Sequence, residues 1–216
     1  FVDSFIIDSG ERSPMGLAFN NDGTKMFVLG DDGNDVSEYS LTTGFDVLAY
    51  PLAVNFVDSF SIASQDNDPM GLAFNNDGTK MFVVGNYGND VNEYTLTTGF
   101  DVSSASFVDS FNVNSQDTYP TDITFNNDGT KMFVLGLRGY DVNEYTLSSA
   151  YTLFDSTNPT LSSSTPTDHA TDVAIDSNIV LNFSESVDVV TIFNSTKSTI
   201  NMGYIFKTHI LERFCS

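Results

Sequence analysis

Hydrophobic residues along this chain fall into short clusters that recur at a nearly constant interval. The string Phe-Asn-Asn-Asp-Gly-Thr-Lys-Met-Phe-Val occurs three times without change, at residues 19–28, 74–83 and 125–134. Each copy therefore ends in a run that is apolar at almost every position. A strand that is apolar on both faces must be covered on both faces. We expect this strand of each repeat to lie between two neighbouring sheets.

Each repeat, of roughly 50 residues, reads as four short antiparallel strands. The first ends in an apolar run such as 15–19, and Asn-Asn-Asp-Gly follows as a tight turn, because Asp and Gly tolerate the positive φ that such turns need. The second strand covers 25–29, and the third, such as 90–96, alternates more. The fourth contains Phe-Val-Asp-Ser-Phe, which starts at Phe1, Phe56 and Phe107.

The pattern predicts an all-β fold in which the repeats are blades of a β-propeller. The predicted four-stranded blades cover about residues 12–62, 67–113 and 118–155. A parallel β-helix has far shorter repeats, and an immunoglobulin-like sandwich needs about 100 residues for each domain. Three blades do not close a ring, and 1–7 reads as the fourth strand of a further blade. We therefore expect the chain to be a piece of a longer array.

The repeated Phe-Asn-Asn-Asp-Gly-Thr-Lys string resembles the Phe-Ser-Pro-Asp-Gly hairpin of WD-like and YVTN-type bacterial propellers. The resemblance covers about residues 1–155, with Asn-Asn in place of Ser-Pro and without a Trp-Asp signature. It implies a propeller fold. It implies little about function, because propellers serve both as enzymes and as docking platforms.

The pattern changes after the third repeat. Residues 151–170 are rich in Ser, Thr and Pro, which is typical of a linker. Residues 158–190, which include the string Leu-Asn-Phe-Ser-Glu, resemble the start of a bacterial Ig-like domain of S-layer and other surface proteins. We predict a linker and partial Ig-like β-sandwich over 156–190. An atypical tail, with a different charge balance, is expected over 191–216.

Composition excludes several classes of partner. The formal net charge is −21, from 29 acidic and 8 basic residues. Such a surface repels nucleic acid and anionic membranes. No apolar stretch approaches the ~20 residues of a membrane helix, so no membrane insertion is expected. The single cysteine, Cys215, permits no internal disulfide. These features suit an extracellular or cell-surface protein.

The recurring acidic residues suggest metal sites, but turns explain them as well. Asp22, Asp77 and Asp128 belong to the Asn-Asp-Gly turns, which need them without any ion. A denser oxygen cluster over 31–35 is not kept in the other repeats, so at most one weak cation site is expected there. We predict no cofactor and no metal requirement.

Two further sets of polar residues are candidates for chemistry. Asp3, Asp58 and Asp109 recur in the fourth-strand string, where they can discourage edge pairing or pair with the repeated lysines. The repeated lysines are Lys25, Lys80 and Lys131. His169 and His209 lack a neighbouring nucleophile or acid in a catalytic pattern. Nothing in the sequence therefore marks an active site.

Differences between the repeats fall in two loops, one before the first strand and one between the second and third strands. In an antiparallel meander, connections alternate between edges, so these loops share one edge of every blade. Variable loops on a rigid scaffold are common binding sites. The loops, at 11–13, 31–34, 66–68, 86–89, 117–119 and 137–140, supply the candidate binding residues Arg12, Asp66, Tyr87, Tyr119, Arg138 and Tyr140.

We therefore expect a non-enzymatic platform for binding or adhesion, with a protein or glycan ligand. The alternative is part of a propeller enzyme, of lyase or quinoprotein type, whose active site lies in further blades. An axial ring of His, Arg or acidic residues would favour the enzyme, and further Ig-like modules would favour the binding platform.

Overall fold

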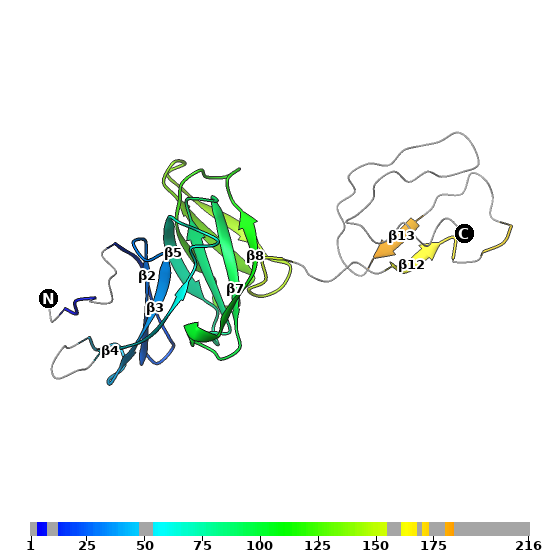
Figure 1. The fold of residues 1–216 in the computed structure, drawn as a ribbon. Helices are drawn as coiled ribbons and strands as arrows, with labels where there is room; N and C mark the ends of the chain where they lie inside the picture. Colours follow the sequence, from blue (N-terminus) through cyan, green and yellow to red (C-terminus); the bar gives the residue numbers. More distant parts are fainter. Residues whose placement is uncertain are drawn as a thin grey trace. The chain divides into compact units, whose positions relative to one another are not determined.

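The computed structural model describes residues 4–7, 13–47, 54–154, 161–167, 170–172 and 180–183 (Figure 1). The chain forms two compact units, Phe1–Asp155 and Ser156–Ser216. The first unit holds three antiparallel sheets built from successive repeats.

The first two sheets are complete four-stranded meanders. The first consists, in spatial order, of β1 (Pro14–Phe19), β2 (Lys25–Gly30), β3 (Asp35–Leu41) and β4 (Val54–Ser61). The second repeats this order with β5 (Pro69–Phe74), β6 (Lys80–Gly85), β7 (Asp90–Leu96) and β8 (Ala105–Asn112), and a short 3₁₀ helix, η1 (Val102–Ser104), precedes β8. The register is the same in both, including a bulge after Glu38 and after Glu93.

The third sheet has three strands in the part of the chain that the structure describes. They are β9 (Pro120–Phe125), β10 (Lys131–Gly136) and β11 (Asp141–Thr146). The expected fourth strand of this blade is absent from it. The physical reason is visible in the sequence, because no Phe-Val-Asp-Ser-Phe string follows Thr146. Instead the chain turns at Ser149–Thr152 and packs back against the second repeat.

The sheets pack face to face as blades of a β-propeller, which confirms the predicted fold class. The inner strands β1, β5 and β9 lie side by side, and β6 also contacts β9. One hydrophobic cluster joins Phe27 and Leu29 of the first sheet to Leu72 and Met81 of the second. A second cluster joins the second sheet to the third. Strands β2 and β6 are buried along nearly their whole length, as their apolar runs predict.

The Asn-Asn-Asp-Gly turns have the predicted left-handed glycine. Gly23, Gly78 and Gly129 have φ of 71°, 71° and 69°. The first Asn of each turn closes the hairpin, since Asn75 Oδ1 accepts a 2.9 Å hydrogen bond from the Lys80 amide. An aromatic ring lies directly over the glycine, and a Cβ on Gly78 would overlap the Phe100 ring. The turn therefore needs glycine for two separate reasons.

In the second unit, the structure describes one antiparallel pair, β12 (Leu161–Thr165) with β13 (Val180–Phe183). The pair falls inside the segment for which a partial Ig-like sandwich is predicted. Most of the predicted linker and all of the predicted tail over 191–216 lie outside the described residues.

Candidate functional site

The two variable loops of each repeat lie against one another at one edge of each sheet, as the meander predicts. The Asp31 amide donates to the Ser13 carbonyl at 3.0 Å. The same bond recurs from Asn86 to Asp68 at 2.9 Å and from Leu137 to Tyr119 at 3.0 Å. We call the surface formed by residues 13, 31–34, 66–68, 86–89, 117–119 and 137–140 the loop edge.

Asp117 fixes the backbone of the loop edge in the third repeat. Its carboxylate accepts hydrogen bonds from the amides of Tyr119 (2.5 Å) and Gly139 (2.5 Å), with a longer one from Arg138 (3.4 Å). Burial would raise the pKa of Asp117, but these backbone donors outweigh it and lower the pKa. The carboxylate is thus a structural brace joining the two loops.

Asp66 has the same place in the second repeat and is fully buried. It accepts a 2.6 Å hydrogen bond from the Asp68 amide, and a Cβ on Gly85 would overlap its carboxylate. Burial raises the pKa of Asp66 above its ordinary value. The expectation that Asp66 contacts a ligand at the surface is therefore wrong. Its side chain supports the loops from below.

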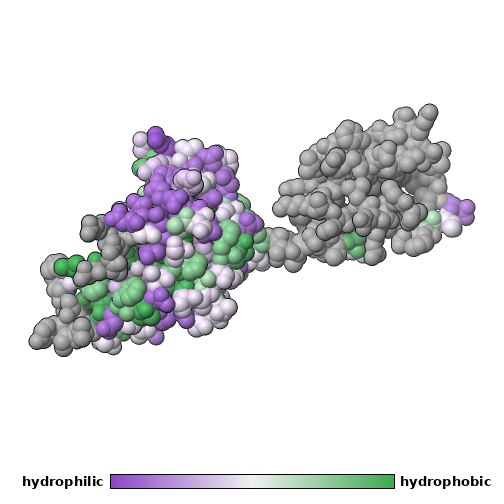
Figure 2. Space-filling model, in the orientation of Figure 1, coloured by the Kyte–Doolittle hydropathy of each residue, from purple (hydrophilic) through white to green (hydrophobic). Residues whose placement is uncertain are grey.

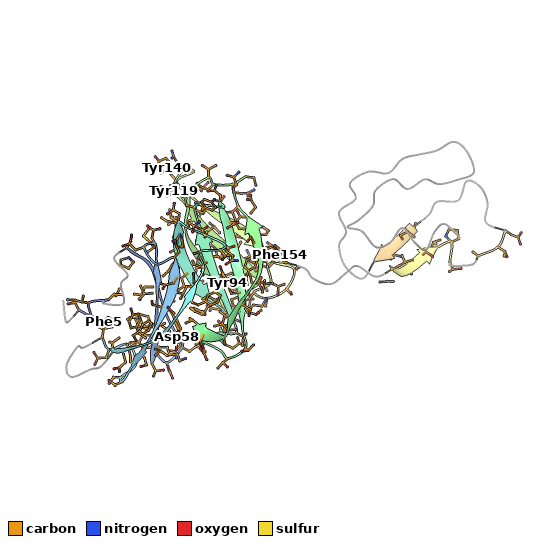
Figure 3. The ribbon with its side chains drawn as sticks, viewed as in Figure 1. Phe5, Asp58, Tyr94, Tyr119, Tyr140 and Phe154 are labelled. Atoms are coloured by element: carbon orange, nitrogen blue, oxygen red, sulfur yellow. The ribbon has the colours of Figure 1, made fainter. Side chains whose placement is uncertain are left out.

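This frame presents aromatic and cationic side chains to solvent, beside the exposed Asp32, Asn67, Thr118 and Leu137. Tyr87 is 71% exposed and Tyr140 is 90% exposed. Arg138 is exposed, and its guanidinium lies 5.9 Å from the centre of the half-buried Tyr119 ring. Figure 3 places Tyr119 and Tyr140 together at the upper end of the first unit, where Figure 2 shows hydrophilic residues gathered. The sixth candidate, Arg12, lies outside the described residues.

Tyr140 has a backbone conformation that is unusual for its residue type. Its φ is 55°, and the equivalent Asn34 and Asn89 have φ of 47° and 50°. Asn adopts this left-handed region more readily than a bulky aromatic residue does. Replacing Asn by Tyr thus strains the backbone here, while the ring of Tyr140 gains almost no burial in return.

The opposite edge carries the invariant turns, which link the sheets to one another. The second Asn of each turn reaches the next repeat: Asn21 Nδ2 donates to the Asn76 carbonyl at 2.7 Å, and Asn76 Nδ2 donates to the Asn127 carbonyl at 2.7 Å. This ladder explains the Asn that stands where the resembling propellers have Pro. The recurrence of both Asn residues in all three repeats is a sequence signal for this ladder, but it does not identify the hydrogen-bond partner.

The turn aspartates are explained without a metal ion. Asp77 Oδ1 accepts hydrogen bonds from the Thr79 amide (3.0 Å) and the Thr79 hydroxyl (2.5 Å), and these bonds lower its pKa. Asp22 and Asp128 do the same with Thr24 and Thr130. Within the described ranges, no group of three His, Cys, Asp or Glu side chains has the geometry of a metal site.

The repeated lysines bind glutamates rather than the fourth-strand aspartates. Lys25 Nζ lies 2.7 Å from Glu38 Oε1, and Lys80 Nζ lies 2.7 Å from Glu93 Oε1. The glutamate is on the adjacent strand β3 or β7, whereas Asp58 is one strand further and accepts from the neighbouring Ser59 amide. Of the two roles considered for Asp58 and Asp109, pairing with the lysines is therefore excluded, and Asp3 lies outside the described residues.

Comparison with known proteins agrees with this division into two parts. Residues 155–208 match the family model of a bacterial Ig-like domain. The match runs past residue 190, where an atypical tail was expected to begin. No curated protein matches the chain. No helix among the described residues is long and apolar enough to cross a membrane.

Solved structures similar to this chain include a β-propeller domain and two lactonases. They include the β-propeller domain of Myceliophteria thermophila Cps50 (Swd1), with 10% identity, a TM-score of 0.46, and coverage of 61% of this chain and 39% of that chain. A putative 6-phosphogluconolactonase from Bacteroides fragilis has 12% identity, a TM-score of 0.48 and coverage of 62% and 34%. The Pseudomonas aeruginosa periplasmic gluconolactonase has 16% identity, a TM-score of 0.45 and coverage of 62% and 35%. The chain thus spans little more than a third of these proteins.

Proposed function

We propose that the loop edge binds a protein or glycan ligand and that the chain acts as a non-enzymatic binding module of an extracellular or cell-surface protein. The observation that carries the proposal is Tyr140, which is held almost fully exposed in a conformation that Asn adopts more easily. Local strain kept at a solvent-exposed aromatic residue is typical of functional sites.

The neighbouring side chains support a binding surface. Tyr87 and Arg138 occupy the same loop position in successive repeats, where the first repeat has Asp32. Tyr and Arg are the residue types that most often dominate binding energy at interfaces. The loops that carry them are braced by Asp66 and Asp117, so little conformational entropy is lost when a ligand binds.

The chemistry of the loop edge favours binding over catalysis. The carboxylate of Asp117 is occupied by backbone amides, and that of Asp66 is enclosed beneath the loops. The exposed groups include two phenol rings and a guanidinium, which stack on sugar rings and pair with polar protein surfaces. The exposed carboxylate of Asp32 has no counterpart in the other two repeats, which have Tyr87 and Arg138 there. The bacterial Ig-like match at 155–208 supports a surface location, since the resembling modules occur in surface proteins.

The proposal is tested by probing glycan and extracellular-protein arrays with the labelled chain. We expect a ligand whose binding weakens roughly tenfold or more in Tyr87→Ala and in Arg138→Ala, with unchanged melting temperature. Val108→Ala, at an exposed position on β8, is the matched control and should bind normally. If both loop variants bind every retained ligand as well as the control does, the loop edge is not the binding surface.

A further inference from the structure

The outer edge of β11 has no strand beside it in the described part of the chain. In the first two sheets, the equivalent strands β3 and β7 are covered by β4 and β8 and are mostly buried. Strand β11 is largely exposed along its length. An open strand edge is a template for pairing with another segment of chain. The third sheet is therefore one strand short.

Residues Ser4–Ile7 resemble an outer strand that has no sheet of its own among the described residues. They belong to the same string as β4 and β8, but none of the four described sheets includes them. Their position relative to the first sheet is that of an outer strand from a preceding blade. Phe5 meets Tyr39 edge-on with ring centres 5.5 Å apart. The same arrangement is found for Phe60 with Tyr94 (5.5 Å) and for Phe111 with Tyr145 (5.4 Å).

The two outer faces of the unit repeat the residues of the buried interfaces. On the third sheet, Val142 is 61% exposed, whereas the equivalent Val36 and Val91 are fully buried against the next sheet. On the first sheet, Leu17 is 60% exposed, whereas the equivalent Leu72 is buried against the sheet before it. The outer face of the third sheet thus resembles the faces that are buried against a following sheet. The outer face of the first sheet resembles the faces that are buried against a preceding sheet.

The polar groups that join neighbouring sheets inside the unit recur on its outer faces, where they have no neighbouring sheet to bind among the described residues. Inside the unit, Lys80 donates to the Tyr151 carbonyl of the next repeat (2.7 Å), and Glu93 accepts from the Leu153 amide (3.1 Å). The third sheet has the same ion pair, Lys131 with Glu144 at 2.5 Å, but both side chains are exposed. At the other end, Phe45 is exposed, whereas its equivalents Phe100 and Tyr151 supply the backbone carbonyls that bind Lys25 and Lys80 of the preceding repeat.

We propose that a second copy of this chain completes the third sheet. Its Ser4–Ile7 segment pairs with β11 as an antiparallel outer strand, and its first sheet packs on the third sheet. The internal repeats set the register, because Phe60 faces Val36 and Phe111 faces Val91. Phe5 of the second copy accordingly faces Val142. Ile62 and Val113 donate to the carbonyls of Asn34 and Asn89, so the Ile7 amide donates to the Tyr140 carbonyl.

This association is head to tail, because the contacting surfaces differ. When the first sheet of each copy packs on the third sheet of the other copy, two contacts form and six sheets come together. Propellers close at this number of sheets. Closure leaves neither copy with an open β11 edge. The proposed contact reaches the loop edge only at the backbone carbonyl of Tyr140. Tyr87 is 71% exposed although its sheet is packed on both sides, so the ligand-binding variants at Tyr87 and Arg138 test the other proposal separately.

One residue of the third sheet differs from its equivalents in a way that weakens the contact. Gly16 and Gly71 lie where the next inner strand approaches most closely, and a Cβ on Gly71 would lie only 2.7 Å from Asp122 Cα. The third repeat has Asp122 at this position. Asp122→Gly should therefore tighten the association. A weaker association in this variant would contradict packing of the first sheet on the third.

Light scattering coupled to size exclusion tests the proposal on the whole chain. We expect twice the monomer mass, and we expect Leu17→Arg and Val142→Arg each to weaken association by about 30-fold or more. Mixing these two variants should restore a dimer, because one of the two contacts then joins two unaltered faces. A monomeric parent chain, or variants that do not complement each other, would overturn the head-to-tail arrangement.

Cysteine pairing tests the strand register. In a Cys215→Ser background, Phe5→Cys with Val142→Cys should oxidise to covalent dimers, since facing residues of paired strands have Cβ atoms about 5 Å apart. Phe5→Cys with Asn143→Cys is the control, because a one-residue shift puts the side chains on opposite faces. Equal cross-linking by both pairs, or cross-linking only within one chain, would show that the N-terminal segment does not occupy the β11 edge.

Discussion

Lys80 and Tyr151, which are 71 positions apart in the sequence, are joined by a 2.7 Å hydrogen bond from the ammonium group to the backbone carbonyl. Glu93 completes the contact by binding Lys80 at 2.7 Å and accepting from the Leu153 amide. Lys25 and Glu38 form the same contact with Phe100 and Val102. Each contact fastens the loop of one repeat to the sheet of the repeat before it.

We predict that Glu93→Gln lowers the free energy of unfolding by about 2 kcal/mol, because a buried carboxylate loses its charge and the ammonium group loses its partner. Urea denaturation measures this change. Glu144→Gln is the matched control, since the same ion pair is exposed there and should contribute at most about 1 kcal/mol. Both are measured in the Leu17→Arg background, which blocks the proposed association and so keeps Glu144 exposed without placing a cation beside it. Equal losses would show that the contact between repeats adds nothing.

The strands and turns were predictable because their causes are local. Positive φ at Gly78 follows from the Asn-Asp-Gly string, and the burial of β6 follows from its unbroken apolar run. The contact made by Lys80 and Glu93 was not predictable, because their partners Tyr151 and Leu153 lie 71 and 60 positions away and meet them only when the sheets pack. The sequence offered the lysines only the partners Asp58 and Asp109 as one alternative, and these share their repeat but lie on a more distant strand.

The candidate site was predictable as a set of loops but not residue by residue. Alternation of the strands places Tyr87 and Arg138 on one edge, and the structure finds them exposed there. Variation between repeats does not distinguish an exposed side chain from a buried brace, so Asp66 was wrongly counted as a surface residue. The missing fourth strand of the third sheet was overlooked because the repeat length, rather than the absence of its string, set the expected boundary.

We predict that Gly78→Ala destabilises the unit by more than the roughly 1 kcal/mol expected from positive φ alone, because its Cβ would also overlap the Phe100 ring. Thermal or urea unfolding of Gly78→Ala gives the total. The same change in a Phe100→Ala background isolates the conformational cost. If the two backgrounds show the same loss, the ring over the glycine has no effect on the choice of residue.

Asn76→Ala should lower the free energy of unfolding by about 1 kcal/mol, since Asn76 Nδ2 donates to the Asn127 carbonyl and Asn76 Oδ1 accepts from the Tyr151 hydroxyl. The equivalent side chain of Asn127 has no such bond to a following repeat among the described residues. Asn127→Ala is therefore the control, and its stability should stay close to that of the parent chain. A larger loss at Asn127 than at Asn76 would contradict the ladder between sheets.

Acid should weaken the turns. The pKa values of Asp22, Asp77 and Asp128 are lowered in the folded chain by hydrogen bonds from the threonine two residues on. A carboxyl group whose folded pKa is depressed stabilises the fold above its unfolded pKa, here 3.8, and this stabilisation is lost as the pH falls through the lower folded value. Asp66 acts in the opposite sense, because its raised pKa favours the fold at low pH.

The contribution of a turn aspartate to the pH dependence of stability can be separated from that of Asp66 by removing the threonine that donates to the turn aspartate. We predict that the free energy of unfolding, measured in urea between about pH 6 and pH 2, falls less steeply below pH 3.8 in Thr79→Ala than in the parent chain. The hydroxyl of Thr79 is the largest cause of the lowered Asp77 pKa, so its loss brings that pKa back toward its ordinary value. Thr95→Ala, at an exposed position of β7 outside the turn, should leave the steepness unchanged. Identical pH profiles for Thr79→Ala and the parent would mean that the aspartate–threonine bonds do not couple folding to protonation.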